Sequence, residues 1–135
     1  MNIALMAHDG KKELMVQFCI AYCGILSGHS ICATSSTGKL ISEATGLSAT
    51  MYLSIPQGGV QQVGARIAYN EIDLVLFFCD PSEHDNFTGI NEIARLCDQY
   101  NVPFASNVAT AEVLIQGLRR GDMDWRDIVN PKNRK

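Results

Sequence analysis

Short apolar runs alternate with longer amphipathic stretches along the whole chain. The apolar runs, each bounded by turn residues, predict strands over 3–7, 30–34, 49–53, 72–78 and 102–105. Apolar side chains at three- and four-residue spacing predict helices over 11–26, 37–45, 59–69, 91–99 and 109–118. Strands that alternate with helices form βαβ units, whose right-handed crossovers place the strands in parallel between helical layers. The pattern therefore predicts an α/β fold, a three-layer αβα sandwich around a five-stranded parallel sheet.

The length and the charge balance narrow the possibilities further. A chain of 135 residues has the size of one domain, and we expect residues 1–135 to form it. A polar tail over 122–135 is expected to pack on its own or a neighbouring subunit. The formal net charge is −3, from 11 basic and 14 acidic residues, and like charges do not cluster. This balance gives no reason to expect binding to nucleic acid or to a membrane surface.

The cysteines and the N-terminus indicate a cytoplasmic protein. The 5 cysteines are odd in number and lie among apolar residues, which is typical of buried thiols in a reducing compartment. Cys19 and Cys23 are close in sequence, but no second Cys or His pair accompanies them, so no metal site is predicted. The apolar run at the N-terminus stops at His8 and is too short for a signal peptide or a membrane span.

Hydroxyl-bearing residues follow two of the predicted strands. In parallel α/β sheets, ligands bind at the carboxyl ends of the strands. One such loop offers four hydroxyls beside the free amides of a helix N-terminus, and it reads Thr34-Ser35-Ser36-Thr37-Gly38. Lys12, one turn into the first helix, and Ser54, ahead of Gly58-Gly59, belong to two further loops at this edge. The three loops together predict an anion site, although an ordinary capping turn also explains the hydroxyls.

Two aspartates and two histidines are candidates for proton transfer at the same edge. Asp9 and Asp80 each follow directly on a predicted strand, where a carboxylate can act as acid or base. Both also suit structural roles, Asp9 as a helix cap and Asp80 in an Asp-Pro turn. His8 is placed to polarise a carbonyl group, and His84 lies in a polar loop that can face a ligand.

Six motifs in order give the chain a resemblance to a known family. They lie at 3–12, 33–38, 43–47, 58–65, 72–81 and 103–111. With these motifs the chain, from Asn2 to about Asp127, resembles the methylglyoxal synthases. That resemblance implies a parallel five-stranded αβα sandwich, a homohexamer, and elimination of phosphate from dihydroxyacetone phosphate without a metal or organic cofactor.

The resemblance also implies roles for individual residues. The phosphate would be held by the residues that match the family's cradle, which are Lys12, Thr34, Ser36, Thr37 and Ser54. Asp9 and Asp80 match the family's pocket carboxylates, and His8 matches the histidine that precedes the first of them. Arg134 is the nearest counterpart of a C-terminal arginine that the family lends to a neighbouring subunit's phosphate.

The chain departs from the family pattern at four places around this pocket. Val60 stands where the family has its proton-abstracting aspartate, and a valine side chain cannot accept a proton. Ile55 and Ser35 each replace a glycine of the family's phosphate loops. The loop 82–89 lacks the family's histidine-containing element, and His84 does not have its spacing.

These departures led to two hypotheses about function. The first is a non-catalytic relative that binds a phosphorylated small molecule, such as a nucleotide or a nucleotide-derived signal, as a sensor or a sponge. Its pocket would add Ser35, Ile55, Gly59, Val60 and His84 to the matched cradle. The second is an active methylglyoxal synthase that uses Asp9 or Asp80 as the base. Under both hypotheses we expect a homo-oligomer that binds neither nucleic acid nor a membrane.

Overall fold

The sheet has five parallel strands with β1 at its centre. A computed structural model describes residues 1–83 and 87–129. The strands are β1 (Asn2–Ala7), β2 (Ser30–Thr34), β3 (Ala49–Tyr52), β4 (Leu74–Phe78) and β5 (Phe104–Ala105). They lie in the order β3-β2-β1-β4-β5, and all four pairings are parallel. The predicted five-stranded parallel sheet is confirmed.

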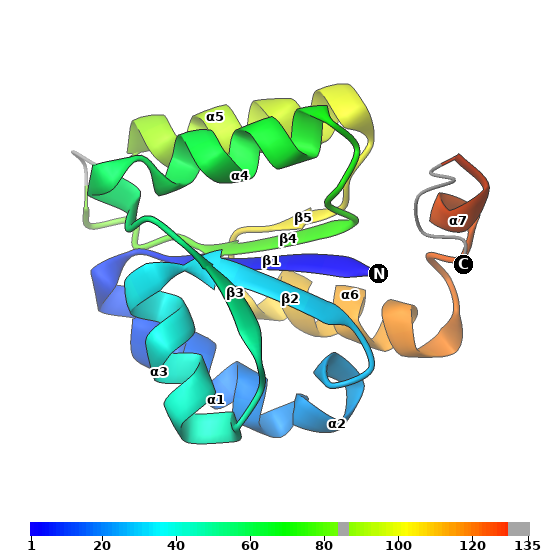
Figure 1. Cartoon of the computed structure of the whole chain (residues 1–135), viewed down its shortest axis with the longest axis horizontal. Helices are drawn as coiled ribbons and strands as arrows, with labels where there is room; N and C mark the ends of the chain where they lie inside the picture. The colour runs from blue at the N-terminus through cyan, green and yellow to red at the C-terminus, as the bar shows by residue number, and fades with distance from the viewer. Residues whose placement is uncertain (84–86, 130–135) are drawn as a thin grey trace.

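Helices cover both faces of this sheet (Figure 1). One face carries α4 (Gly59–Ala68) and α5 (Phe87–Tyr100). The other carries α1 (Lys12–Ala21), α2 (Cys23–Leu26), α3 (Ser35–Thr45) and α6 (Val108–Arg120). Short 3-10 turns η1 (Asp9–Lys11) and η2 (Ile55–Gln57) follow β1 and β3, and α7 (Trp125–Val129) ends the described chain. No helix of the described residues is long and apolar enough to cross a membrane.

Each face of the sheet has its own apolar core. Alternate residues of a strand point to opposite faces, so Ile3 and Leu5 pack on the α1 side while Ala4 and Met6 pack on the α4 side. All five residues of β4 are buried, as expected for a strand covered on both faces. Burial on both faces also explains why the sequence of this strand is an almost continuous apolar run.

Two predicted helices differ most from the observed ones. The helix predicted over 11–26 is divided at Tyr22, whose φ of −111° and ψ of 21° depart from helical geometry. The helix predicted to begin at Asn91 begins at Phe87 instead. Its buried residues Ile90, Ile93 and Cys97 continue the spacing that Phe87 starts, and this spacing would have located the true beginning.

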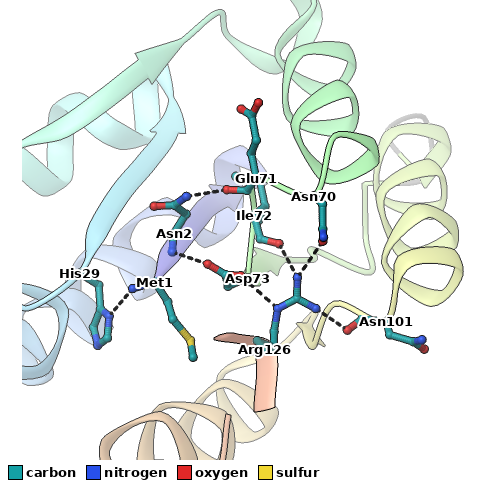
Figure 2. Close-up of polar contacts among 9 residues, drawn as sticks. All are labelled: Met1, Asn2, His29, Asn70, Glu71, Ile72, Asp73, Asn101 and Arg126. Atoms are coloured by element: carbon teal, nitrogen blue, oxygen red, sulfur yellow. Dashed lines mark hydrogen bonds and ion pairs between the residues drawn. The ribbon is translucent and has the colours of Figure 1, made fainter. Parts of the chain in front are cut away.

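A buried arginine joins the last helix to the amino ends of β1 and β4 (Figure 2). The side chains of Arg126 and Asp73 are 1% and 0% exposed, and Arg126 Nε lies 3.1 Å from Asp73 Oδ1. The other guanidinium nitrogens donate to the carbonyl oxygens of Asn101 and Ile72 and to Asn70 Oδ1. The second Asp73 oxygen accepts the backbone N–H of Asn2 at 2.8 Å. The Arg126–Asp73 ion pair and its hydrogen bonds therefore connect α7 with the amino end of β1 and with the residues around Asn70 to Asp73.

The described part of the tail is held by Arg126 rather than by its tryptophan. Trp125 remains 42% exposed, and its ring lies 5.5 Å from the Arg126 guanidinium carbon. Figure 1 shows α7 standing at the end of the sheet away from η1 and η2. Packing of the tail on a neighbouring subunit stays a prediction.

Removing the buried arginine should destabilise the protein. We expect Arg126→Met to lower the free energy of unfolding by about 3–5 kcal/mol, because the Asp73 charge would stay buried after losing its cation. The matched control is Arg120→Met, which breaks the surface pair of Arg120 with Asp122, whose side chains are 59% and 55% exposed. This control should cost less than about 1 kcal/mol. Denaturant unfolding of the three proteins measures both effects, and equal losses would contradict the structural role of Arg126.

Candidate functional site at the carboxyl ends of the strands

A small cavity lies where β1, β2 and β3 end. Its volume is about 130 Å³, and its lining comprises Ala7, His8, Asp9, Lys12, Ser36, Ile55 and Pro56. Because β1 pairs in parallel with β2, and β2 with β3, the loops that follow these strands emerge at the same edge of the sheet. The cavity therefore collects side chains from three loops that are far apart in the sequence.

His8 is held in a single orientation at the end of β1. Its side chain is buried, and its Nδ1 accepts the backbone N–H of Asp80 at 2.9 Å. Since a backbone amide only donates, the proton of the neutral ring is on Nε2. The ring contacts Phe77 edge-on and stacks near Phe87. Nε2 is buried and has no hydrogen-bond partner among the described residues, so it is available to a bound ligand.

The N-terminus of α3 supplies hydroxyls and free backbone amides. The predicted loop is shorter than expected, because Ser35 and Ser36 already belong to the first turn of α3. Thr34 is the N-cap residue, but its side chain makes no capping hydrogen bond. The hydroxyls of Thr34 and Thr37 are buried without a partner among the described residues. First-turn amides carry a partial positive charge, so this helix end suits an anion.

Lys12 links the first loop to this helix end. Its ammonium nitrogen lies 2.8 Å from Ser36 Oγ and 2.6 Å from Asp9 Oδ1. The Lys12 side chain is only 19% exposed, whereas that of Asp9 is 86% exposed at the mouth of the cavity. The cation therefore lies inside the cavity with a hydroxyl on one side and a carboxylate on the other.

The turn after β3 brings Ile55 to the cavity, whereas Ser54 is not part of its lining. Ser54 Oγ donates to Gln57 Oε1 at 2.9 Å, so this hydroxyl is engaged within its own turn. Gly59 follows in the first turn of α4, where a side chain would overlap the carbonyl oxygen of Leu53. Val60 is 5% exposed and packs in the core under α4 and α5, where it lines a different, larger cavity.

Asp80 lies at the end of β4 but does not line the small cavity. Its Oδ1 accepts hydrogen bonds from the hydroxyl and the backbone N–H of Ser82, at 2.7 and 3.0 Å. These two bonds lower the pKa of the Asp80 carboxyl below its ordinary value. Oδ2 lies so close to Gly10 that a side chain there would overlap it. Asp80 therefore positions His8 through its backbone, while its carboxylate serves the local turn.

Some site residues lie outside the described residues, and others were missed. His84 and Arg134 fall in the segments that the structure does not describe, so their predicted roles stay predictions. Pro56 and Phe87 were not predicted to belong to the site. Phe87 was missed because its helix was predicted to begin at Asn91. Pro56 was missed because it matches the family pattern, whereas the neighbouring Ile55 departs from it.

The cysteines take no part in this site. All five are free, and Cys19, Cys32 and Cys97 are buried while Cys23 and Cys79 are half-buried. Burial raises the pKa of the Cys19 and Cys97 thiols to about 12 and that of Cys32 to about 11. Over residues 1–83 and 87–129, no three His, Cys, Asp or Glu side chains are grouped to hold a metal ion.

The fold and the site define a class of protein, an αβα sandwich with a lysine, hydroxyl groups and a helix N-terminus at the ends of its parallel strands. Comparison with known proteins then identifies the family. The family described as MGS-like domain matches residues 15–106. Methylglyoxal synthase of Caldicellulosiruptor saccharolyticus is 57% identical over all of this chain and 96% of its own. Methylglyoxal synthase of Geobacillus thermodenitrificans is 52% identical over 96% of this chain and 91% of its own. This chain belongs to the methylglyoxal synthase family.

A solved structure agrees with this assignment. The crystal structure of methylglyoxal synthase from Elizabethkingia anophelis superposes with a TM-score of 0.77 at 41% identity. The match covers 84% of this chain and 76% of the other. The homohexamer and the cytoplasmic location expected from the sequence stay predictions.

The relatives overturn the first functional hypothesis, a non-catalytic sensor or sponge. Proteins 47–57% identical to this chain over its full length are named methylglyoxal synthase, which favours the active enzyme. That hypothesis was based on the four departures around the pocket, yet the small cavity still contains a histidine, a lysine and a carboxylate. A cavity of about 130 Å³ also suits a short phosphorylated compound better than a nucleotide.

The unpartnered threonine hydroxyls should serve a ligand rather than the fold. We expect Thr37→Val to leave the stability unchanged or higher, because it removes a buried hydroxyl that has no partner. The affinity for inorganic phosphate should fall about tenfold to a hundredfold, the effect of one hydrogen bond to a charged group. Calorimetric titration and thermal unfolding measure the two effects.

A second threonine of α3 provides the matched control. Thr45 Oγ1 donates to the Ile41 carbonyl oxygen at 2.6 Å and accepts the Leu47 N–H at 3.1 Å. Thr45→Val should therefore lower the stability without changing phosphate affinity. If Thr37→Val behaved in the same way, the Thr37 hydroxyl would have a structural role only.

Proposed function

We propose that this protein is a methylglyoxal synthase, which removes phosphate from dihydroxyacetone phosphate and releases methylglyoxal. One observation carries the proposal: three buried polar atoms at this edge have no partner among the described residues, His8 Nε2, Thr34 Oγ1 and Thr37 Oγ1. Buried polar groups are normally hydrogen-bonded, so such a group indicates a ligand. An imidazole N–H suits a carbonyl oxygen, and hydroxyls suit a phosphate. The substrate carries both groups.

In this proposal the phosphate binds between Lys12 and the N-terminus of α3. The Lys12 ammonium, the Ser36 hydroxyl and the first-turn amides supply positive charge and donors. The hydroxyls of Thr34 and Thr37 are buried at the same helix end without lining the small cavity, and in this proposal they become accessible to the phosphate and complete the cradle. The near-neutral charge of the whole chain means that this attraction is local rather than a field of the whole protein.

The reaction starts when a base removes a proton from the hydroxymethyl carbon, on the side of the carbonyl group away from the phosphate. The electrons of the broken C–H bond form a C=C bond, and the carbonyl electrons move onto the oxygen to give an enediolate. His8 Nε2–H stabilises the charge that develops on this oxygen, as a donor of an oxyanion hole does. The terminal hydroxyl then passes its proton to the departing phosphate and becomes the aldehyde carbonyl, while the C=C electrons shift and break the C–O bond to phosphate. The enolate that remains takes up the proton from the base on its terminal carbon and becomes methylglyoxal.

Asp9 is the better of the two candidate bases. It lines the small cavity, whereas Asp80 is outside it and bonded to Ser82. A general base must come within hydrogen-bond reach of the proton that it abstracts. The 2.6 Å contact with Lys12 places the Asp9 carboxylate beside the proposed phosphate cradle. In this chain Asp9 would take the role that the family pattern assigns to the position of Val60.

The activity itself is tested with the purified protein and dihydroxyacetone phosphate. We expect inorganic phosphate and a dicarbonyl product to appear in equal amounts, at about 1 to 10³ turnovers per second. A rate no faster than that of the free substrate in buffer would end the proposal.

Replacing each aspartate separately identifies the base. Asp9→Asn should lower kcat by a factor of about 10² to 10⁴, the usual contribution of a general base, with a smaller change in KM. Asp80→Asn keeps the backbone N–H that orients His8 and should lower kcat much less. The measurement is steady-state phosphate release by the two variants and the unchanged protein. The reverse order of effects would assign the base to Asp80.

A further inference from the structure

Two cavities meet at the turn after β3. The small cavity beside His8 and Lys12 has a volume of about 130 Å³. The second, of about 690 Å³, is lined by residues of η2, α4 and α5, among them Val60, Gln61, Thr88 and Glu92. Within the described residues, Ile55 and Pro56 are the two that line both cavities. This pair of side chains therefore stands between the proposed reaction site and a much larger space.

The turn that carries Ile55 is closed by several hydrogen bonds. The carbonyl oxygen of Ser54 accepts the N–H groups of Gln57 and Gly59, at 3.0 and 2.9 Å. The Ser54 hydroxyl donates to Gln57 Oε1, and Pro56 fixes one backbone angle of the same turn. The half-buried Ile55 side chain packs against the core cluster that contains Val60. Its position is thus set by the turn and by packing.

The two volumes differ in what they can hold. Since one water takes up about 30 Å³ of liquid, the small cavity has the volume of about four waters. The larger cavity falls within the range of about 300–1,000 Å³ that is usual for sites of organic ligands. Its polar side chains, Gln61, Thr88 and Glu92, suit the hydroxyl groups of a longer sugar chain.

We infer that Ile55 determines substrate size: its side chain closes the small cavity against the larger one and so restricts the site to a three-carbon phosphate. The inference rests on the proposed function for the identity of the reaction, but the size limit applies to binding as well as to turnover. A carbon chain too long for the small cavity would meet the Ile55 side chain in its wall. Without this side chain, the longer chain would extend into the larger cavity and meet the polar residues there.

The test compares two ligands on three proteins. Isothermal titration is done in the Asp9→Asn background, so that dihydroxyacetone phosphate is turned over too slowly to disturb the measurement. It gives the binding of dihydroxyacetone phosphate and of a six-carbon ketose 1-phosphate to Asp9→Asn alone and combined with Ile55→Ala or with Gln61→Ala. For Ile55→Ala we expect the affinity ratio of the six-carbon to the three-carbon ligand to rise about tenfold or more, because the change removes three carbons and one methylene group alone is worth about tenfold in a pocket. Gln61→Ala enlarges only the second cavity and should leave this ratio unchanged. Ile55→Val, which keeps a branched side chain, should give an intermediate ratio.

Each result has a defined meaning. An unchanged ratio in Ile55→Ala, with normal thermal unfolding, would overturn the inference, and so would an equal rise in Gln61→Ala. If Ile55→Ala fails to fold, Ile55→Val decides the question on the same ratio. Failure of the proposed function is recognised separately: the unchanged protein would then release no phosphate from dihydroxyacetone phosphate, while the binding ratios would still report on the size limit.

Discussion

The pairing of β1 with a strand on each side is the constraint on which the site depends. β1 pairs with β2 through Asn2 to Leu5 and with β4 through Ile3 to Ala7. These backbone hydrogen bonds fix how far each neighbouring strand extends, and hence where the loops after them begin. His8 continues this register, because its N–H donates to the Phe78 carbonyl oxygen and its ring accepts the Asp80 N–H. A shift of one residue would move every side chain of β1 to the opposite face of the sheet, so packing in the two apolar cores protects the register.

The amino ends of β1 and β4 are held by the buried ion pair of Arg126 with Asp73. Burying an ion pair costs desolvation, and such a pair persists where further hydrogen bonds satisfy the remaining donors and acceptors. Arg126 meets this condition, since it donates to Asp73, to two carbonyl oxygens and to the Asn70 side chain. The small cavity and the Arg126–Asp73 ion pair lie at opposite ends of the sheet. The ion pair therefore stabilises the fold at a distance from the buried polar atoms that have no partner among the described residues.

The departures from the family pattern have a shared physical effect. Val60 is part of the core beneath α4 and α5 and lines the larger cavity, and Ile55 stands between that cavity and the small one. Ile55 makes the wall between the cavities more apolar and Val60 does the same for the lining of the larger cavity, and neither removes the cation, the histidine or the hydroxyls of the cradle. The loss of one carboxylate therefore argues for a rearranged site more than for an inactive protein. The high identity to methylglyoxal synthases agrees with that view.

Hydrophobic periodicity alone determined the architecture of this protein, because the burial of a strand or helix leaves a local pattern in the chain. It predicted the five strands and the parallel sheet, and the chemistry of the strand ends suggested His8, Asp9 and Lys12 as neighbours. The helix ends were less accurate, as at Tyr22 and Phe87, since packing decides where a helix stops.

Only the tertiary structure decided which polar residues meet. Nothing around Arg126 in the sequence marks it as buried, because its partner Asp73 is remote in the chain and both look like ordinary surface residues. Asp9 and Asp80 follow their strands in the same way, yet one lines the cavity and the other bonds to Ser82. Ile55 lines both cavities, and this likewise depends on where η2 lies relative to α4 and α5. Such relations join residues that are distant in sequence, and their energies exist only once the chain has folded.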